Sequence, residues 1–181
     1  MDNLQAKSPC AGLLPLTIGK MSLNEEAPGA LTSLAPYKGE QAALSKAMEG
    51  AHGVAYPGAN DTSQGNGARA VWFGYGQALL IGPAADVELS THAALVDQSD
   101  AWSVVRLNGP EVEAVLSRLV PVDVRLSVFP VGQTARTLVM HMSGSITRTD
   151  ADTFEILVFR SMADTLVHDM KTAMEAIAAR G

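Results

Sequence analysis

The sequence predicts an α+β fold in which antiparallel sheets are covered by helices. Both halves of the chain read as a strand, a helix and two further strands, with an added helix. Two apolar runs separated by a four-residue turn show the pattern of a β-hairpin, and two later segments show helical periodicity with one apolar face. Strands and helices in this arrangement bury their apolar faces best when helices pack on antiparallel sheets.

The first third of the chain is expected to begin irregularly and to become ordered after residue 30. Residues 1–30 carry prolines and glycines without a sustained period, which predicts an irregular N-terminal arm. A strand near residues 31–37 then leads into a helix of about residues 40–49, rich in Ala and Leu. Gly50 is expected to end this helix, and the Gly-, Asn- and Ser-rich residues 53–67 are expected to form a long flexible loop.

The middle of the chain predicts a hairpin, a short helix and two more strands. The hairpin strands are expected at residues 70–73 and 78–81. Pro83 is expected to open a short helix that runs to Glu88. Strands near residues 93–96 and 103–107 follow, separated by a polar turn.

A helix is expected to begin at Asn108-Gly109-Pro110, where a proline's missing N–H costs little. Its apolar residues recur at helical spacing, which predicts one buried face, and Pro121 ends it. These residues are Val112, Val115, Leu116 and Leu119.

The last third predicts three strands and a C-terminal helix. The strands are expected at about residues 137–142, 145–148 and 153–159. Ser161 and Asp164 resemble a capping box at the start of the helix. One apolar stripe along this helix is expected to pack on the core; its members are Met162, Leu166, Met170, Met174 and Ile177.

Length and composition bound the class of protein. The chain has 181 residues, which fits one ordinary domain or two small lobes that share a core. We expect a single domain over residues 31–181, with lobes at about 31–92 and 93–181. The net charge is −6 and the Lys and Arg residues are scattered, so nucleic acid is not expected as a partner. The 47% hydrophobic content contains no long apolar run, so no membrane span is expected.

Cysteine usage and the N-terminal residues point to the cytoplasm. Cys10 is the single cysteine, which excludes an internal disulfide and a site of several thiolates, and which fits a reducing compartment. The apolar residues 11–18 follow Asp2 and are broken by Gly12 and Pro15, so a secretory signal is not expected.

No catalytic, cofactor-binding or metal-binding residue is predicted. The four histidines, His52, His92, His141 and His168, are widely separated, and none belongs to a pair with metal-ligand spacing. His168 follows Asp164 at i, i+4 spacing, which fits an acid–imidazole contact or a surface ion pair equally well. A Ser, His and Asp set that meets only in space stays open, although no G-x-S-x-G elbow is present.

Carboxylates and glycine-rich segments are expected to serve turns. Asp97, Asp100 and Asp123 are candidates for acid–base chemistry, but Asp97 and Asp100 flank a turn whose backbone they can bind instead. Gly65-Asn66-Gly67 and Gly74-Tyr75-Gly76 lack the third glycine, the Lys-Ser/Thr pair and the immediate helix of phosphate-binding loops. Both are therefore expected to be turns.

Several ordered segments resemble the gamma-subunit family of heterotetrameric sarcosine oxidase over about residues 69–181. They are Val71-Trp72-Phe73-Gly74, Leu79-Leu80-Ile81-Gly82-Pro83, Val96-Asp97-Gln98-Ser99-Asp100, Val105-Arg106-Leu107-Asn108-Gly109-Pro110, Pro121-Val122-Asp123-Val124, Phe129-Pro130-Val131-Gly132 and Phe154-Glu155-Ile156-Leu157-Val158-Phe159-Arg160-Ser161. Val115-Leu116 and Thr137 extend the match, and Ala11-Gly12-Leu13-Leu14-Pro15 and Tyr56-Pro57-Gly58 agree more loosely.

The resemblance implies a two-lobed fold similar to the folate-binding domain of aminomethyltransferases. It also implies a complex that oxidises sarcosine to glycine with release of hydrogen peroxide and passes the one-carbon unit to tetrahydrofolate. FAD, FMN, NAD, zinc and tetrahydrofolate are then expected in the complex and none of them in this chain. The implied partners are alpha, beta and delta subunits, and the implied role is a non-catalytic scaffold.

The sequence departs from the family pattern at Gly74-Tyr75-Gly76-Gln77-Ala78. Relatives tend to carry Gly-Pro, an acidic residue and a second Trp there, and this chain has neither the acid nor that Trp. The departure weakens any transfer of folate binding to this chain. A stand-alone folate-binding aminomethyltransferase-like protein is the alternative reading, and an unrelated single-domain binding protein is a third.

Overall fold

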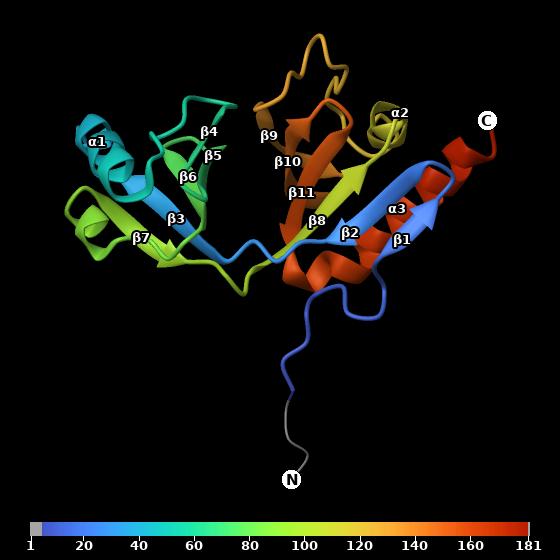
Figure 1. Cartoon of the computed structure of the whole chain (residues 1–181), viewed down its shortest axis with the longest axis horizontal. Coiled ribbons are helices and arrows are strands. Elements are labelled where there is room, and N and C mark those ends of the chain that lie inside the picture. The colour runs from blue at the N-terminus through green and yellow to red at the C-terminus, as the bar shows by residue number, and fades with distance from the viewer. Residues whose placement is uncertain (1–4, 181) are drawn as a thin grey trace.

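The chain folds into two antiparallel sheets that lie side by side, each with helices on its outer face (Figure 1). The computed structural model describes residues 5–180. The six-stranded sheet has the order β1 (Leu16–Ile18), β2 (Met21–Glu25), β8 (Trp102–Asn108), β11 (Thr153–Phe159), β10 (Met142–Asp150) and β9 (Thr134–Val139). The five-stranded sheet has the order β4 (Thr62–Gly65), β5 (Ala68–Gly74), β6 (Gln77–Gly82), β3 (Ala30–Pro36) and β7 (Ala93–Asp97).

Three α-helices and two short 3₁₀-helices accompany the strands within residues 5–180. They are α1 (Gln41–His52), η1 (Val87–Thr91), α2 (Val112–Leu116), η2 (Arg160–Met162) and α3 (Ala163–Ala178). The predicted fold class, α+β with antiparallel sheets and helices, is confirmed. None of these helices is both long enough and apolar enough to cross a lipid bilayer.

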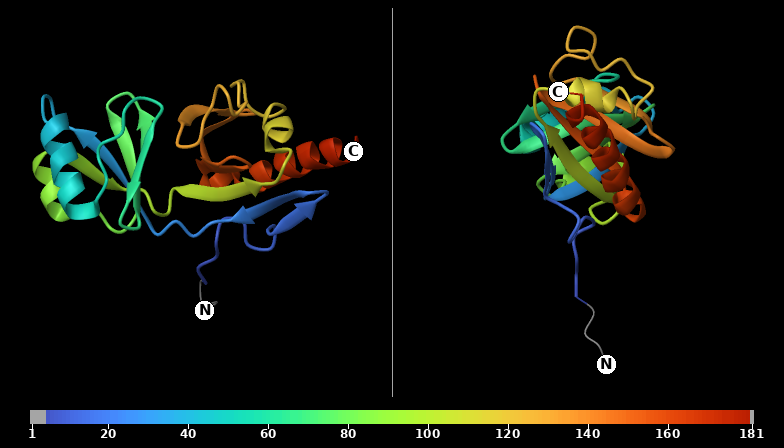
Figure 2. Two further views of the ribbon diagram at one scale, coloured as in Figure 1. Left: turned by 45° about the horizontal axis from the view of Figure 1, so that its top comes forward. Right: turned by 90° about the vertical axis from the view of Figure 1, so that its right-hand side faces the viewer.

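The largest core lies between the six-stranded sheet and the helices α2 and α3, which run along its outer face (Figure 2). Alternate residues of β11, such as Phe154 and Ile156, point into this core. They meet Leu166 and Met170 from the apolar face of α3. The stripe predicted for the C-terminal helix is confirmed at four of its five positions, because Met162 lies before α3 and is exposed.

A second core lies between the five-stranded sheet and α1. Leu44 and Met48 of α1 pack on Leu34 of β3 and Leu80 of β6. The opposite face of the same sheet carries a third apolar cluster, which joins the two sheets. That cluster consists of Leu31, Val71, Phe73, Leu79 and Ile81 from the five-stranded sheet and Trp102, Val104 and Leu157 from the six-stranded sheet.

A fully buried arginine attaches the segment between α2 and β9 to the six-stranded sheet. The guanidinium of Arg148 donates to the carbonyl oxygens of Val124 and Ala151, and its Nη2 lies 2.9 Å from Oε1 of Glu113. Its Cζ also lies 4.4 Å from the centre of the Phe154 ring. A buried charge requires such partners, so the loop and the sheet are held together at this point.

The N-terminal residues differ from the expectation of an irregular arm over residues 1–30. Residues 16–25 form β1 and β2, and β2 pairs with β8, so that Ser22 lies opposite Asn108. The partner strand lies more than 80 residues away, and local sequence patterns do not record such pairings. The first strands therefore belong to the sheet formed by the second half of the chain, whereas β7, at residues 93–97, belongs to the five-stranded sheet.

The loop expected over residues 53–67 contains a strand as well. β4 pairs with β5 through a tight turn at Asn66 and Gly67, which both have positive φ angles. The first helix also runs past Gly50 and ends at Gly53, whose left-handed φ of 69° and N–H bond to Glu49 form the cap. Gly53 also leaves room for Asn66, whose side chain a Cβ there would meet.

Three other helix boundaries differ from the sequence prediction. The helix expected from Pro83 instead forms at residues 87–91, because the Asp86 carboxylate accepts the Glu88 N–H and caps it there. α2 ends at residue 116, so the expected helix is shorter, although Leu119 is buried as predicted. No capping box forms at Ser161, because η2 precedes α3 and the cap residue Met162 makes no side-chain hydrogen bond.

The expected strand over residues 137–142 is also shifted. β9 and β10 meet in a turn at Met140, whose φ is positive, so residues 137–142 span two strands.

A charge on the buried face of α3 should unfold the protein. We expect Leu166→Glu to lower the free energy of unfolding by about 4 kcal/mol or more, because an uncompensated carboxylate would enter the core. Urea denaturation of the purified chain measures the change. Thr165→Glu, one residue earlier on the exposed face of α3, is the matched control and should behave like the parent. Equal stability of the two variants would contradict the placement of α3.

Candidate functional site

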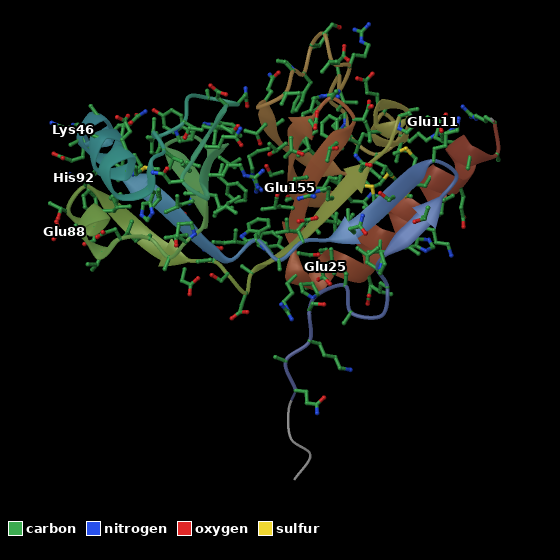
Figure 3. The ribbon with its side chains drawn as sticks, in the orientation of Figure 1. Glu25, Lys46, Glu88, His92, Glu111 and Glu155 are labelled. Carbon is green, nitrogen blue, oxygen red and sulfur yellow. The ribbon has the colours of Figure 1, made fainter. Side chains whose placement is uncertain are left out.

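The residues that sequence reasoning singled out for chemistry lie on separate elements. Figure 3 shows His92 on the outer side of the five-stranded sheet and Glu155 between the two sheets. His92 Nδ1 lies 2.8 Å from Oε2 of Glu40, and buried His52 accepts the backbone N–H of Asp86 at 3.1 Å. Both histidines therefore hold the ends of α1 and η1 in place.

The other two histidines lie in the second half of the chain. His141 is exposed in the turn between β9 and β10, and His168 is on the exposed face of α3. No hydrogen bond or ion pair joins Asp164 to His168 within residues 5–180. In the same part of the chain, no group of three or more His, Cys, Asp or Glu side chains is placed to hold a metal ion.

Asp97 and Asp123 bind their own turns; the sequence predicts this for Asp97 and for Asp100, and a turn hydrogen bond is found for Asp97. Its Oδ1 accepts from the side chain and the backbone of Ser99, and these hydrogen bonds lower the pKa of Asp97. Asp123 accepts from the side chain and backbone of Arg125, which lowers the pKa of Asp123 to about 2. Asp100 is exposed in the turn before β8.

The two glycine-rich segments are turns, as predicted. Gly65-Asn66-Gly67 connects β4 to β5, and Gly74-Tyr75-Gly76 connects β5 to β6. In the second turn, Gly76 has a φ of 62° and Tyr75 projects fully into solvent. Neither turn leads into a helix, so neither presents a row of helical N–H groups to an anion.

Cys10 is a buried thiol in a polar contact. Its Sγ lies 3.3 Å from Oγ of Ser103, and its backbone N–H donates to Oε1 of Glu25 at 2.8 Å. Burial raises the pKa of the Cys10 thiol, so little thiolate is present at neutral pH. The residue anchors the N-terminal segment to the six-stranded sheet.

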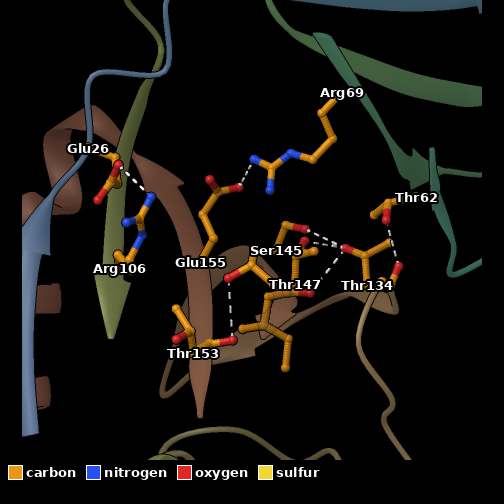
Figure 4. A network of polar contacts seen from close by, with 12 residues as sticks. Glu26, Thr62, Arg69, Arg106, Thr134, Ser145, Thr147, Thr153 and Glu155 are labelled. Carbon is orange, nitrogen blue, oxygen red and sulfur yellow. Dashed lines mark hydrogen bonds and ion pairs between the residues drawn. The ribbon is translucent and has the colours of Figure 1, made fainter. Parts of the chain in front are cut away.

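A cleft with a volume of about 550 Å³ opens between the two sheets. Two ion pairs line it (Figure 4). Arg69 Nη2 of β5 lies 2.5 Å from Oε1 of Glu155 on β11, and Arg106 Nη2 lies 3.0 Å from Oε2 of Glu26. Because a carboxylate already neutralises each arginine, the cleft offers no unpaired cation to an anionic ligand.

The Arg69–Glu155 pair is also a bridge between the sheets. The two side chains are 18% and 10% exposed, so solvent screens their interaction only weakly. Two further hydrogen bonds cross nearby: Thr62 Oγ1 donates to the carbonyl of Gly132 at 2.7 Å, and the Thr134 N–H donates to the carbonyl of Asn60 at 3.0 Å. The sequence does not predict the Arg69–Glu155 pair, because its two residues lie 86 positions apart in the chain.

The described lining of this cleft offers no unpaired arginine to a dinucleotide diphosphate. Such an anion is commonly bound at a helix N-terminus or by free cations, and Arg69 and Arg106 are both paired. At the turn where relatives carry an acid and a second Trp, this chain presents Tyr75 to solvent and ties Gln77 to Ser33 at 2.8 Å.

One family model matches most of the chain. The family model described as "Sarcosine oxidase, gamma subunit family" matches residues 38–175. A chain of the heterotetrameric sarcosine oxidase from Corynebacterium sp. U-96 is similar in structure, with a TM-score of 0.80, 23% identity and coverage of 96% of both chains. No curated protein matches the sequence.

A second solved structure shares the fold more distantly. The glycine cleavage system aminomethyltransferase T from Bartonella henselae superposes with a TM-score of 0.53 at 13% identity. The match covers 85% of this chain and 46% of the aminomethyltransferase. The predicted similarity to the aminomethyltransferase fold is thereby confirmed.

Removing the carboxylate of the Arg69–Glu155 pair should destabilise the protein. We expect Glu155→Gln to lower the free energy of unfolding by about 1–3 kcal/mol, because it leaves the partly buried guanidinium of Arg69 without its carboxylate. Arg125→Gln, which removes a pair of the same 2.5 Å separation at the exposed surface, is the control and should leave stability unchanged. Urea titrations compare the two. An equal effect would show that the pair between the sheets is no stronger than a surface pair.

The thiol of Cys10 should be unreactive in the folded protein. We expect iodoacetamide to alkylate it at least about tenfold more slowly in native buffer than in denaturing urea at the same pH. Burial keeps the reagent away from the sulfur, and it raises the pKa of the thiol so that less thiolate is present. Mass spectrometry of timed samples measures both rates. Equal rates would place Cys10 at the surface.

Proposed function

The chain belongs to the sarcosine oxidase gamma subunit family, and we propose that it works as a non-catalytic assembly subunit of a heterotetrameric sarcosine oxidase. The observation that carries the proposal is the dispersal of its candidate chemical groups. The histidines, the cysteine and the carboxylates named above lie on separate elements, and most of them bind neighbouring backbone or side chains. A catalytic set needs such groups to converge on one reacting atom.

The match in solved structures supports the same role. The similar chain is one whole chain of a complex described as a heterotetramer, and the coverage of 96% on both sides leaves little of either chain unmatched. We propose alpha, beta and delta subunits as the partners of this chain. We further propose that the complex oxidises sarcosine to glycine and hydrogen peroxide and passes the one-carbon unit to tetrahydrofolate.

The cofactors are assigned to the other subunits in this proposal. FAD, FMN, NAD and tetrahydrofolate would belong to the two large subunits and zinc to the smallest, as the family resemblance implies. The paired arginines of the cleft and the altered Gly74–Ala78 turn support an assignment of folate away from this chain. We propose the cytoplasm as its compartment, which the free thiol of Cys10 supports. No comparison supports the stand-alone aminomethyltransferase alternative.

Assembly is the direct test of the proposed function. We expect a tagged copy of the chain, purified gently from its native host, to bring down two larger flavoprotein-type subunits and one small subunit in a constant ratio. Native mass spectrometry measures that ratio. Purified alone, the chain should be colourless and should release no peroxide from sarcosine. A lone monomer in extract, or flavin retained by the separate chain, would contradict the proposal.

Substitution of the candidate residues should spare turnover. We expect His52→Gln, His92→Gln, His141→Gln, His168→Gln and Cys10→Ser to keep the turnover of assembled complex within a few-fold of the parent. A catalytic acid, base or nucleophile typically contributes about 10²-fold or more. Peroxide release per mole of complex is the measurement, and the yield of complex is scored separately. A variant that assembles normally but loses a hundredfold in turnover would assign chemistry to this chain.

A further inference from the structure

Arg136 on β9 lies against two aromatic rings that come from different sheets and contact each other. Its guanidinium carbon lies 4.2 Å from the centre of the Phe73 ring and 5.4 Å from that of Trp102. Phe73 belongs to β5 of the five-stranded sheet, and Trp102 begins β8 of the six-stranded sheet. Aromatic faces attract a cation, but they do not accept its N–H groups as a carboxylate does.

The counter-ion of Arg136 is missing from the part of the chain that the structure describes. Four other arginines each have a carboxylate within 4.0 Å; they are Arg69, Arg106, Arg125 and Arg148. The remaining three, Arg118, Arg160 and Arg180, are exposed, so water can accept their hydrogen bonds. Within residues 5–180, Arg136 is the one arginine that is partly buried and has no carboxylate within 4.0 Å.

Two hydrogen-bond donors of this cluster also have no acceptor. Nη1 of Arg136 and Nε1 of Trp102 are buried and unpartnered within the described residues. Trp102 is 6% exposed, and burial lowers the pKa of Arg136. Buried donors are nearly always satisfied in a finished structure. Arg136 and Trp102 therefore need a hydrogen-bond acceptor, and the positive charge of Arg136 favours a negatively charged one.

Exposed apolar side chains border this arginine. Leu138 follows Arg136 by two residues on the same face of β9, and Phe159 of β11 stacks on Trp102 with 4.6 Å between ring centres. Leu138 and Phe159 are 47% and 45% exposed. We call these three residues, Arg136, Leu138 and Phe159, the Arg136 patch. Aromatic residues and Arg are the side chains enriched at the energetic centres of protein interfaces.

We propose that the Arg136 patch is a docking surface for another subunit of the complex, which presents an Asp or Glu carboxylate flanked by apolar side chains. The carboxylate accepts hydrogen bonds from the guanidinium, whose residue remains partly exposed, and the flanking side chains cover Leu138 and Phe159. This inference rests on the proposed function, because it names the surface through which the assembly subunit binds.

Assembly of point variants tests the docking surface. We expect Arg136→Met to weaken binding of the chain to the other subunits by about tenfold or more, and Arg136→Glu to weaken it further by repulsion. Arg106→Met is the matched control, because Arg106 already has its carboxylate on Glu26, and it should bind like the parent. Titrations of each purified chain into the complex stripped of it, followed by size exclusion, measure the affinities. Thermal melting of each isolated chain shows whether it is folded.

A zero-length cross-link identifies the occupant. In R136K, the introduced amine can be coupled to a neighbouring carboxylate by a carbodiimide, even if R136M should fail to fold. We expect peptide mass spectrometry of the assembled R136K complex to find position 136 joined to an Asp or Glu of another subunit. Joining to a second copy of this chain, or no joining in a fully assembled complex, overturns the inference.

The proposed function and the docking surface can be disproved separately. If the parent chain does not assemble with other subunits at all, the proposed function falls and this inference falls with it. If the parent assembles and R136M assembles with the same affinity while folded, the docking surface alone is wrong and the proposed function stands.

Discussion

Within residues 5–180, the chain passes between its two sheets only twice, at residues 26–29 and 98–101, so the arrangement of the sheets depends on the contacts between them. Two short crossings at one side do not fix the angle between the sheets, so noncovalent contacts must do so. The apolar cluster of Phe73, Trp102 and Leu157 buries apolar surface between the sheets. The Arg69–Glu155 pair adds a polar contact whose geometry is directional. Because a carboxylate binds a guanidinium only in a narrow geometry, the pair fixes how the faces of the two sheets lie opposite each other.

The sequence predicted the parts of the fold that are local. The hairpin of β5 and β6, the strand β11 and the apolar face of α3 all have short-range patterns, and each was found near its expected place. β1 and β2 were missed because their order depends on β8, far along the chain. The helix ends were missed where another residue provides the cap, as at Gly53, whose left-handed φ and N–H bond to Glu49 end α1 after the expected Gly50.

For the candidate site, the sequence predicted only that this chain carries no catalytic, cofactor-binding or metal-binding residue. Sequence patterns single out residues that act as neighbours in the chain, such as metal-ligand pairs, and this chain has none of those patterns. The contacts that matter most here join residues from different sheets. Arg136 carries no motif, and its special position depends on Phe73 and Trp102, which only the folded chain brings together.

The buried guanidinium of Arg148 has a consequence for the motion of the segment it holds. Residues 120–133 contain no helix or strand, and a surface segment of this kind usually exchanges its amide protons through small local openings. Here an opening at Val124 would leave a charge in the interior with fewer partners. Opening of the segment should therefore cost more than opening of an ordinary surface loop, and we expect its amide protons to exchange slowly for a stretch without helix or strand.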